Sequence, residues 1–299
     1  MKKILMSALC LGLAATVLLA SCGKKDETKT NEKEQKPVVE DTAVEEEAPE
    51  IVLPEYQLDY EVKIDGMDLT ATIVEYKGNA DTVAIPATVI DPEYGDECPV
   101  VAIGASAFLG NETLKEISFP ETLTSIEEGA FQNCSALEKV TLPEGVKKIG
   151  AKAFYNSKLT EINIPATVKE IGKFAFSTQL NETPWYAAQK EPLVVVGDGI
   201  LLKYNGTEDV ELGEDIKSIA YYAFSEAGAI TVTLPAGLES IDSDAIFEAD
   251  GKTEVVLLAP FGSKTIETLS MTTFKYQVFG EPEAEPAEDD AAEAEVAAE

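Results

Sequence analysis

The sequence lacks the side chain that most often carries acid–base catalysis, because none of its 299 residues is histidine. This absence excludes Ser-His and Cys-His nucleophile pairs and every His-containing zinc site. Carboxylates are plentiful, with 55 Asp and Glu residues, so acid pairs of the glycosidase type arise by proximity alone and single out no position. The sequence therefore predicts no catalytic residue, no metal site and no cofactor.

The cysteines offer two kinds of chemistry. Cys10 and Cys22 lie near the N-terminus, whereas Cys98 and Cys134 lie far apart in the body and show no Cys-x-x-Cys spacing. The latter two can pair as a disulfide in an oxidising compartment. The favoured alternative is a small buried core residue at Cys134 and a loop thiol at Cys98, because free cysteine is often fully buried.

The N-terminus carries the pattern of an export signal. Lys2-Lys3 is followed by an apolar run that ends at Leu19, and then by Ala20-Ser21-Cys22. This box resembles the lipobox of bacterial lipoproteins. The resemblance implies removal of residues 1–21, a diacylglycerol thioether on Cys22, and a lipid-anchored protein on the extracytoplasmic face of the cell membrane. The alternatives are an ordinary signal peptide with an incidental cysteine and a single-pass anchor, for which the run is short.

The charge is concentrated in two low-complexity segments. The chain has a formal net charge of -32. Residues 22–55, after the predicted cleavage site, and residues 281–299 are acidic and nearly free of aromatic residues, so we expect a disordered tether and a disordered tail. The remaining body is also acidic. This charge argues against nucleic acid and anionic lipid headgroups as partners.

Between these segments the chain repeats itself. An Ala-Phe pair returns with Phe108, Phe131, Phe154, Phe176 and Phe224, at steps of 23, 23, 22 and 48 residues. The last step is close to two periods, so an insertion keeps the frame. A fixed period near 23 residues is typical of a solenoid of stacked coils, in which each coil buries its apolar face against its neighbours.

Apolar positions within the repeat form columns. Each copy that ends in a Leu-x-x-Val-x-Leu type pattern predicts a short half-buried strand, and the proline after it stops the strand because it has no N–H to donate. The isoleucine column consists of Ile103, Ile126, Ile149, Ile171, Ile219 and Ile241.

The pattern Leu-x-x-Ile-x-Leu-Pro-x-x-Leu-x-x-Ile-x-x-x-Ala-Phe-x-x-Cys, read over residues 80–260, resembles the BspA-like branch of the leucine-rich repeat family. The resemblance implies a β-strand-rich leucine-rich repeat solenoid with short helical turns. It also implies a surface-associated role in adhesion or binding, with no shared active site. Ile246 replaces the aromatic residue in the last copy, and only Cys134 occupies the cysteine position of the pattern.

We expect the solenoid to span residues 56–280. Alternation over 58–64 and 69–76 predicts a hairpin, which in the resembling family caps the first coil. The insertion at residues 177–209 contains Trp185, Tyr186 and a second predicted hairpin around Gly197-Asp198-Gly199. A capping helix is predicted over 263–270 and a last strand within 272–279.

Candidate binding residues are aromatic groups at turns or in the insertion and polar groups on the outward strand positions. Such residues suit a protein or glycan ligand, and a solvated rim is the alternative for each of them. For Trp185 the favoured interpretation is coverage of an exposed solenoid edge. The candidates are Trp185, Tyr186, Tyr155, Tyr221, Tyr222, Lys115, Lys139 and Asn163.

Three functions remain open at this stage. The sequence favours a monomeric, surface-anchored and non-catalytic binding module whose partner is a surface protein or glycan, because repeat arrays bind over extended faces. A passive structural protein of the envelope is the second hypothesis. A carboxylate-based glycosidase is the third, and no acid in an apolar setting supports it.

Overall fold

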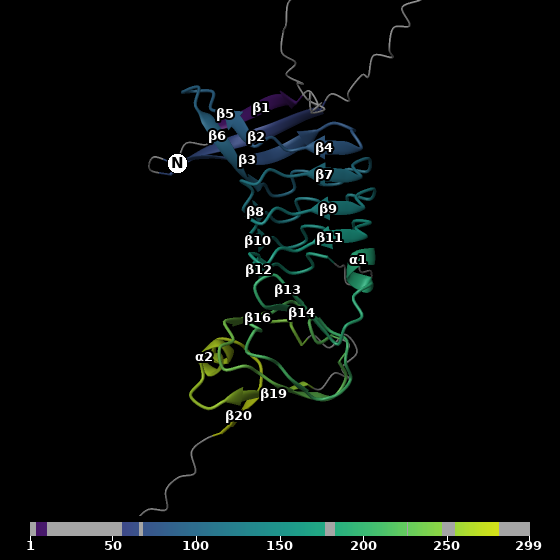
Figure 1. The fold of residues 1–299 in the computed structure, drawn as a ribbon, viewed down its shortest axis with the longest axis vertical. Helices are drawn as coiled ribbons and strands as arrows, with labels where there is room; N and C mark the ends of the chain where they lie inside the picture. The colour runs from purple at the N-terminus through teal and green to yellow at the C-terminus, as the bar shows by residue number, and fades with distance from the viewer. Residues whose placement is uncertain are drawn as a thin grey trace, which may run out of the picture.

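The computed structural model describes residues 4–10, 56–65, 68–176, 183–225, 227–246 and 255–280. In these ranges the chain forms a stack of short coils that contains little helix (Figure 1). The predicted repeat solenoid is therefore confirmed. The coils fall into two arrays, because two separate pairs of sheets run along the stack.

The first array is built on two sheets to which most coils contribute one strand each. The neighbouring repeat strands are parallel, as in Ile126 beside Ile149 and Val140 beside Ile162. β5 (Thr88–Ile90) pairs antiparallel with β6 (Glu97–Ile103) at the side. The first sheet contains β1 (Ile4–Cys10), β2 (Tyr56–Asp65), β3 (Asp68–Lys77), β6 (Glu97–Ile103), β8 (Ser125–Ile126), β10 (Lys148–Ile149) and β12 (Glu170–Ile171), and the second contains β4 (Thr82–Ala84), β7 (Glu116–Ser118), β9 (Lys139–Thr141) and β11 (Glu161–Asn163).

The predicted N-terminal hairpin caps this array. β2 and β3 pair antiparallel, and β3 continues into the repeat sheet through parallel pairing with β6. The ring of Tyr76 stacks on Phe108 at a centroid distance of 4.9 Å, so the hairpin supplies the first ring of the phenylalanine column. β1, which lies within the predicted leader, pairs antiparallel with β2.

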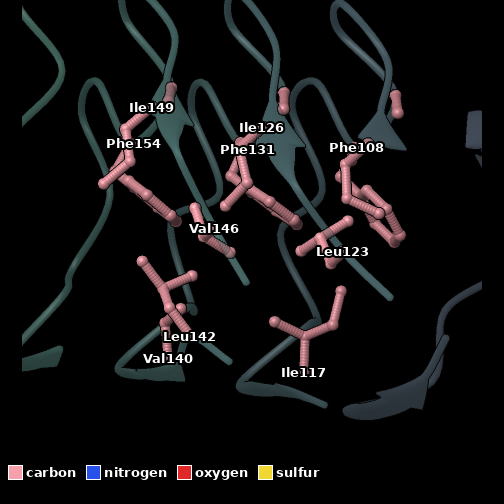
Figure 2. Packing of buried hydrophobic residues seen from close by; sticks show 14 of the residues in the cluster. Phe108, Ile117, Leu123, Ile126, Phe131, Val140, Leu142, Val146, Ile149 and Phe154 are labelled. Carbon is pink, nitrogen blue, oxygen red and sulfur yellow. The ribbon is translucent and has the colours of Figure 1, made fainter. Parts of the chain in front are cut away.

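The column of phenylalanines forms the centre of the core (Figure 2). The rings of Phe108, Phe131, Phe154 and Phe176 stack in order, with centroids 5.0, 5.4 and 5.7 Å apart, and each is at most 2% exposed. Burial of one such ring contributes roughly 1.5–3 kcal/mol. The stack adds the favourable offset geometry of aromatic pairs.

The second array begins with the second predicted hairpin. β13 (Leu193–Val196) and β14 (Ile200–Tyr204) pair antiparallel, and Leu201 lies beside Ile219 of the next coil. Tyr204 contacts Phe224 at 5.8 Å, which repeats the role of Tyr76. The two sheets of this array contain, besides the hairpin, β16 (Ser218–Ile219) and β18 (Ser240–Ile241), and then β15 (Val210–Glu211), β17 (Ile230–Thr233), β19 (Val255–Pro260) and β20 (Tyr276–Phe279).

Two short helices lie beside the strands. α1 (Pro184–Ala187) follows Thr183, whose hydroxyl oxygen accepts a hydrogen bond from the Tyr186 N–H. α2 (Lys264–Ser270) confirms the predicted capping helix, and Thr265 inside it donates its hydroxyl to the Pro235 carbonyl. None of the helices in the described ranges is long and apolar enough to cross a bilayer.

The two body cysteines are free and buried. The disulfide alternative is therefore wrong for this structure. Cys98 also differs from the predicted loop thiol, because it lies within β6 and is 0% exposed. Burial raises the pKa of the Cys134 thiol to about 12, and its sulfur lies 3.1 Å from the Phe108 carbonyl oxygen.

Several predictions concern segments outside the described residues. These are the lipobox at Cys22, the tether over residues 22–55 and the acidic tail over 281–299. They stay predictions.

Candidate binding site at the junction of the two arrays

The regular stacking of coils is interrupted between β12 and the second hairpin. At one end the two arrays meet, because the Asp198 N–H donates to the Val168 carbonyl at 2.7 Å. Along β12 they part, because β12 pairs with β10 but ends the path of its sheet. A groove of about 510 Å³ opens there, lined among others by Lys148, Lys169, Glu170, Gly172, Ser218 and Ser240.

The walls of this junction groove carry both signs of charge. Lys148 lies 3.6 Å from Glu127 and 3.8 Å from Glu170. Beside the groove, a hydrogen bond from Lys217 lowers the pKa of Asp198. Most of these side chains are only partly exposed, but solvent still screens the pairs, so they contribute little stability. The mixture of charges leaves the groove without a strong field of one sign.

Lys173 fastens the first array to the second. Its ammonium donates to Asp244 at 2.6 Å and to the Ser243 hydroxyl at 3.1 Å, and it lies 3.4 Å from an Asp242 oxygen. The hydrogen bond to Asp244 is the largest cause of a raised pKa at Lys173. The same ammonium lies 5.4 Å from the centre of the Tyr221 ring, within the range of a cation–π contact.

Four aromatic rings lie next to the Lys173 ammonium and its partners. Phe174 lies 4.4 Å from Tyr221 and 5.7 Å from Tyr222, and the two tyrosine rings stack at 3.9 Å. Tyr155 meets the edge of Phe174 at 6.4 Å. Burial, followed by a hydrogen bond with Tyr222, raises the pKa of the Tyr221 hydroxyl. The structure therefore brings together three of the candidate residues, Tyr155, Tyr221 and Tyr222.

Two of these rings occupy a strained backbone position. The residue before each Ala-Phe pair has a positive φ, and this residue is Ser106, Gly129, Lys152, Phe174 or Tyr222. A non-glycine residue in this region costs roughly 1–2 kcal/mol. Of the five coils with a positive φ at this position, only the two that flank the junction have a bulky aromatic residue there, namely Phe174 and Tyr222. Contacts within the cluster offset this cost.

The polar candidates lie elsewhere, at the β4–β7–β9–β11 sheet, where Lys139 is in β9, Asn163 is in β11 and Lys115 directly precedes β7. Lys115 pairs with Asp81 at 3.5 Å, and Lys139 pairs with Glu161 at 3.3 Å. The Asn163 amide is committed to the backbone of Leu142, to which it donates at 2.9 Å and from which it accepts at 2.7 Å. A groove of about 400 Å³ touches this face, with Asn163 among its lining residues.

The remaining two candidates serve packing. Trp185 is half-buried and contacts Phe176 at 4.9 Å, so it covers the end of the first phenylalanine column, as the edge-covering interpretation predicts. Tyr186 is 7% exposed, and its hydroxyl donates to the Leu202 carbonyl at 3.2 Å. A Tyr186→Ala change would therefore report on stability more than on binding.

Metal binding has no support in the part of the chain that the structure describes. There, no group of three or more Cys, Asp or Glu side chains is placed to hold an ion. The acids Asp242 and Asp244 meet the ammonium of Lys173 instead.

Sequence reasoning missed Lys173, Phe174, Asp242 and Asp244. Alignment of the coils contained a signal for Phe174, because earlier coils have Ser106, Gly129 and Lys152 at its position. A large ring at a position that holds small or flexible residues in the earlier coils indicates that the coil after it does not continue the regular stack. The direction in which the second array departs was not encoded in the repeat pattern.

These coils, columns and sheets define a leucine-rich repeat solenoid. Residues 101–186 and 194–278 match six copies of the BspA type leucine rich repeat region, so the chain belongs to this family. Residues 187–193 lie outside the two matched ranges. This segment includes the first residue of β13 and lies where the two arrays meet.

Solved structures of similar proteins come from several bacteria. A leucine-rich repeat protein from Bacteroides capillosus is 28% identical, over 35% of this chain and 91% of that chain, with a TM-score of 0.28. The leucine rich repeat protein of T. pallidum is 22% identical, over 73% and 95%, with a TM-score of 0.39. One from Bacteroides ovatus is 18% identical, over 74% and 75%, with a TM-score of 0.35. The comparison with curated proteins found no match.

Proposed function

We propose that this protein is a lipid-anchored, non-catalytic binding module on the extracytoplasmic face of a bacterial membrane, and that its ligand is a surface protein or glycan held at the junction groove. Membership of the family supports a binding or structural role. Lipid on Cys22 and the tether would place the solenoid away from the membrane surface, with two or more acyl chains for stable anchoring.

The observation that carries the proposal is the groove of about 510 Å³ where the two arrays part. A solenoid that serves only as a spacer gains nothing from a break in its stacking, because each continuous coil contributes burial and hydrogen bonds. Here the break is kept in place by Lys173 and the aromatic cluster, and it offers polar groups on both walls. This arrangement favours binding over a passive structural role.

The charges in the groove do not favour catalysis. Glycoside hydrolysis needs one carboxyl group whose pKa is raised so that it stays protonated. Glu127 and Glu170 both lie within 4 Å of Lys148, so both are paired with a cation and neither stands in an apolar setting. Turnover of a glycan by the mature protein would contradict the proposal.

The test compares two matched tryptophan variants of the mature chain on arrays of cell-surface glycans and envelope proteins. Ser240 is exposed and lines the groove, so Ser240→Trp would fill it. Ser135 is exposed and lies outside the grooves described above, so Ser135→Trp is the control. We expect Ser240→Trp to weaken binding about tenfold, or roughly 1.4 kcal/mol, and the control to leave it unchanged. Equal binding by both variants would remove the groove as the site, and no binding by the unaltered protein would favour the passive role.

The anchor has its own test. Mass spectrometry of membrane-extracted protein is expected to find an acylated peptide that begins at Cys22, because the thioether forms on that sulfur. Cys22→Ser is expected to release the protein or to leave the leader uncut. A variant that stays membrane-bound and normally processed would show that the lipobox interpretation is wrong.

A further inference from the structure

In the first array, neighbouring coils are joined by the same set of hydrogen bonds, in which two backbone carbonyls of one coil accept from N–H groups of the next. The Lys147 carbonyl accepts from the N–H groups of Lys169 at 2.8 Å and Glu170 at 3.3 Å. The Ile149 carbonyl accepts from the Gly172 N–H at 2.8 Å. The coil before it repeats this arrangement, with the carbonyls of Thr124 and Ile126. The edge of each repeat strand is thus a template for one more parallel strand.

At β12 this template is left unused. The corresponding carbonyls belong to Lys169 and Ile171. In the next coil that carries an Ala-Phe pair, the N–H groups at the equivalent positions are those of Lys217 and Ala220. Those groups donate instead to Gly199 at 2.8 Å and to Leu201 at 2.9 Å, in the second hairpin. Within the described ranges no backbone N–H reaches the Lys169 or Ile171 carbonyl. A strand edge with unused carbonyls can pair with another chain.

The junction groove lies beside this edge. Glu170, Ile171 and Gly172 line one side, and Ser218 and Ser240 belong to the other. The corresponding column of the first array holds Ala102, Ser125, Lys148 and Glu170. Ser218 and Ser240 are shorter than Lys148 and Glu170, the two members of that column that line the groove, so they leave more room on their side. An extended segment of a few residues fits a volume of about 510 Å³.

We propose that the edge of β12 binds an extended peptide segment of a protein partner as an added parallel strand, with peptide N–H groups donating to the carbonyl oxygens of Lys169 and Ile171. This inference rests on the proposed function and assigns its ligand class. Main-chain hydrogen bonds supply the affinity in this mode of recognition, and alternate side chains supply the specificity. Sugar hydroxyls can also donate to carbonyls, but the two oxygens repeat the spacing that strand N–H groups fill in the coils before.

The chain itself shows what such a segment looks like. Residues 166–173, Ala-Thr-Val-Lys-Glu-Ile-Gly-Lys, contain β12, the strand that occupies the preceding edge. A strand of this kind turns Ile inward and charged residues outward. Because the groove carries lysines and acids together, we expect binding to depend weakly on salt.

The probe is a fluorescein-labelled peptide with the sequence of residues 165–174, titrated by anisotropy with the mature chain that carries Cys22→Ser. Two N-methylated forms test the hydrogen-bond phase. One is methylated at the nitrogens that correspond to Glu170 and Gly172, which donate in the preceding coil, and the other at those of Ile171 and Lys173. We expect the peptide methylated at the nitrogens of Glu170 and Gly172 to bind about tenfold more weakly. The peptide methylated at those of Ile171 and Lys173 is expected to lose about twofold or less. Ser240→Trp is expected to weaken binding, and Ser135→Trp is the matched control.

Equal effects of the two methylated forms, or no binding of the peptide at about 1 mM, would overturn strand addition. If an array glycan or protein then still binds in a manner sensitive to Ser240→Trp, the proposed function holds and this inference fails. A glycan as the groove's ligand would also overturn it. Loss of both peptide and array binding would remove the two proposals together.

Discussion

Replacement of Phe131 or Phe154 by alanine is expected to lower the free energy of unfolding by about 3–5 kcal/mol. Both rings are 0% exposed, and each is stacked between two other rings of the column. Removal of either leaves a cavity that the neighbouring coils cannot close, because backbone hydrogen bonds on both sides fix their spacing. Urea denaturation followed by circular dichroism measures the loss.

Matched controls come from the outward strand positions. Lys139 and Glu161 are exposed and pair with one another at 3.3 Å, so Lys139→Ala and Glu161→Ala are expected to cost less than about 1 kcal/mol. Similar losses at the two phenylalanines and the two charged residues would contradict the register of the repeat.

Most of the fold was predictable because the solenoid converts sequence period directly into spatial neighbours. Ile126, Ile149 and Ile171 are 23 and 22 residues apart, and the structure pairs them in adjacent strands. The prolines that follow the β9 and β11 strands end them as their missing N–H predicts. The first hairpin was predicted from alternation, and the second from two β-rich runs around Gly197-Asp198-Gly199. Tyr76 and Tyr204 explain why both hairpins can start an array.

The candidate site was less predictable, because it depends on where the period fails. Three of the eight candidates, Tyr155, Tyr221 and Tyr222, gather at the junction, whereas Lys115, Lys139 and Asn163 lie on another face. A period identifies which coil follows which, but not how the chain restarts after an insertion. The open edge of β12 arises because the N–H groups of Lys217 and Ala220 turn to the hairpin, and this choice depends on tertiary contacts.

The restart of the second array depends strongly on Gly199. We expect Gly199→Ala to lower the free energy of unfolding of that array by roughly 2–5 kcal/mol, as backbone strain and a steric clash combine. Gly199 has a φ of +74°, and an added Cβ would lie 2.1 Å from the Asp215 carbonyl oxygen. Relief of that clash would displace the carbonyl of Gly199, which accepts from Lys217 and Ser218 and starts the ladder to β16.

Gly228→Ala separates the two contributions. Its φ is +72°, close to that of Gly199, but an added Cβ meets no atom within 4 Å. This variant is therefore expected to lose only the backbone cost of roughly 1–2 kcal/mol. Hydrogen exchange with mass spectrometry is expected to show faster exchange in β14 and β16 of Gly199→Ala, with β8 and β10 protected as before. If both glycine variants lose the same stability, or if exchange rises equally in β8 and β10, contact with Asp215 does not control the restart of the second array.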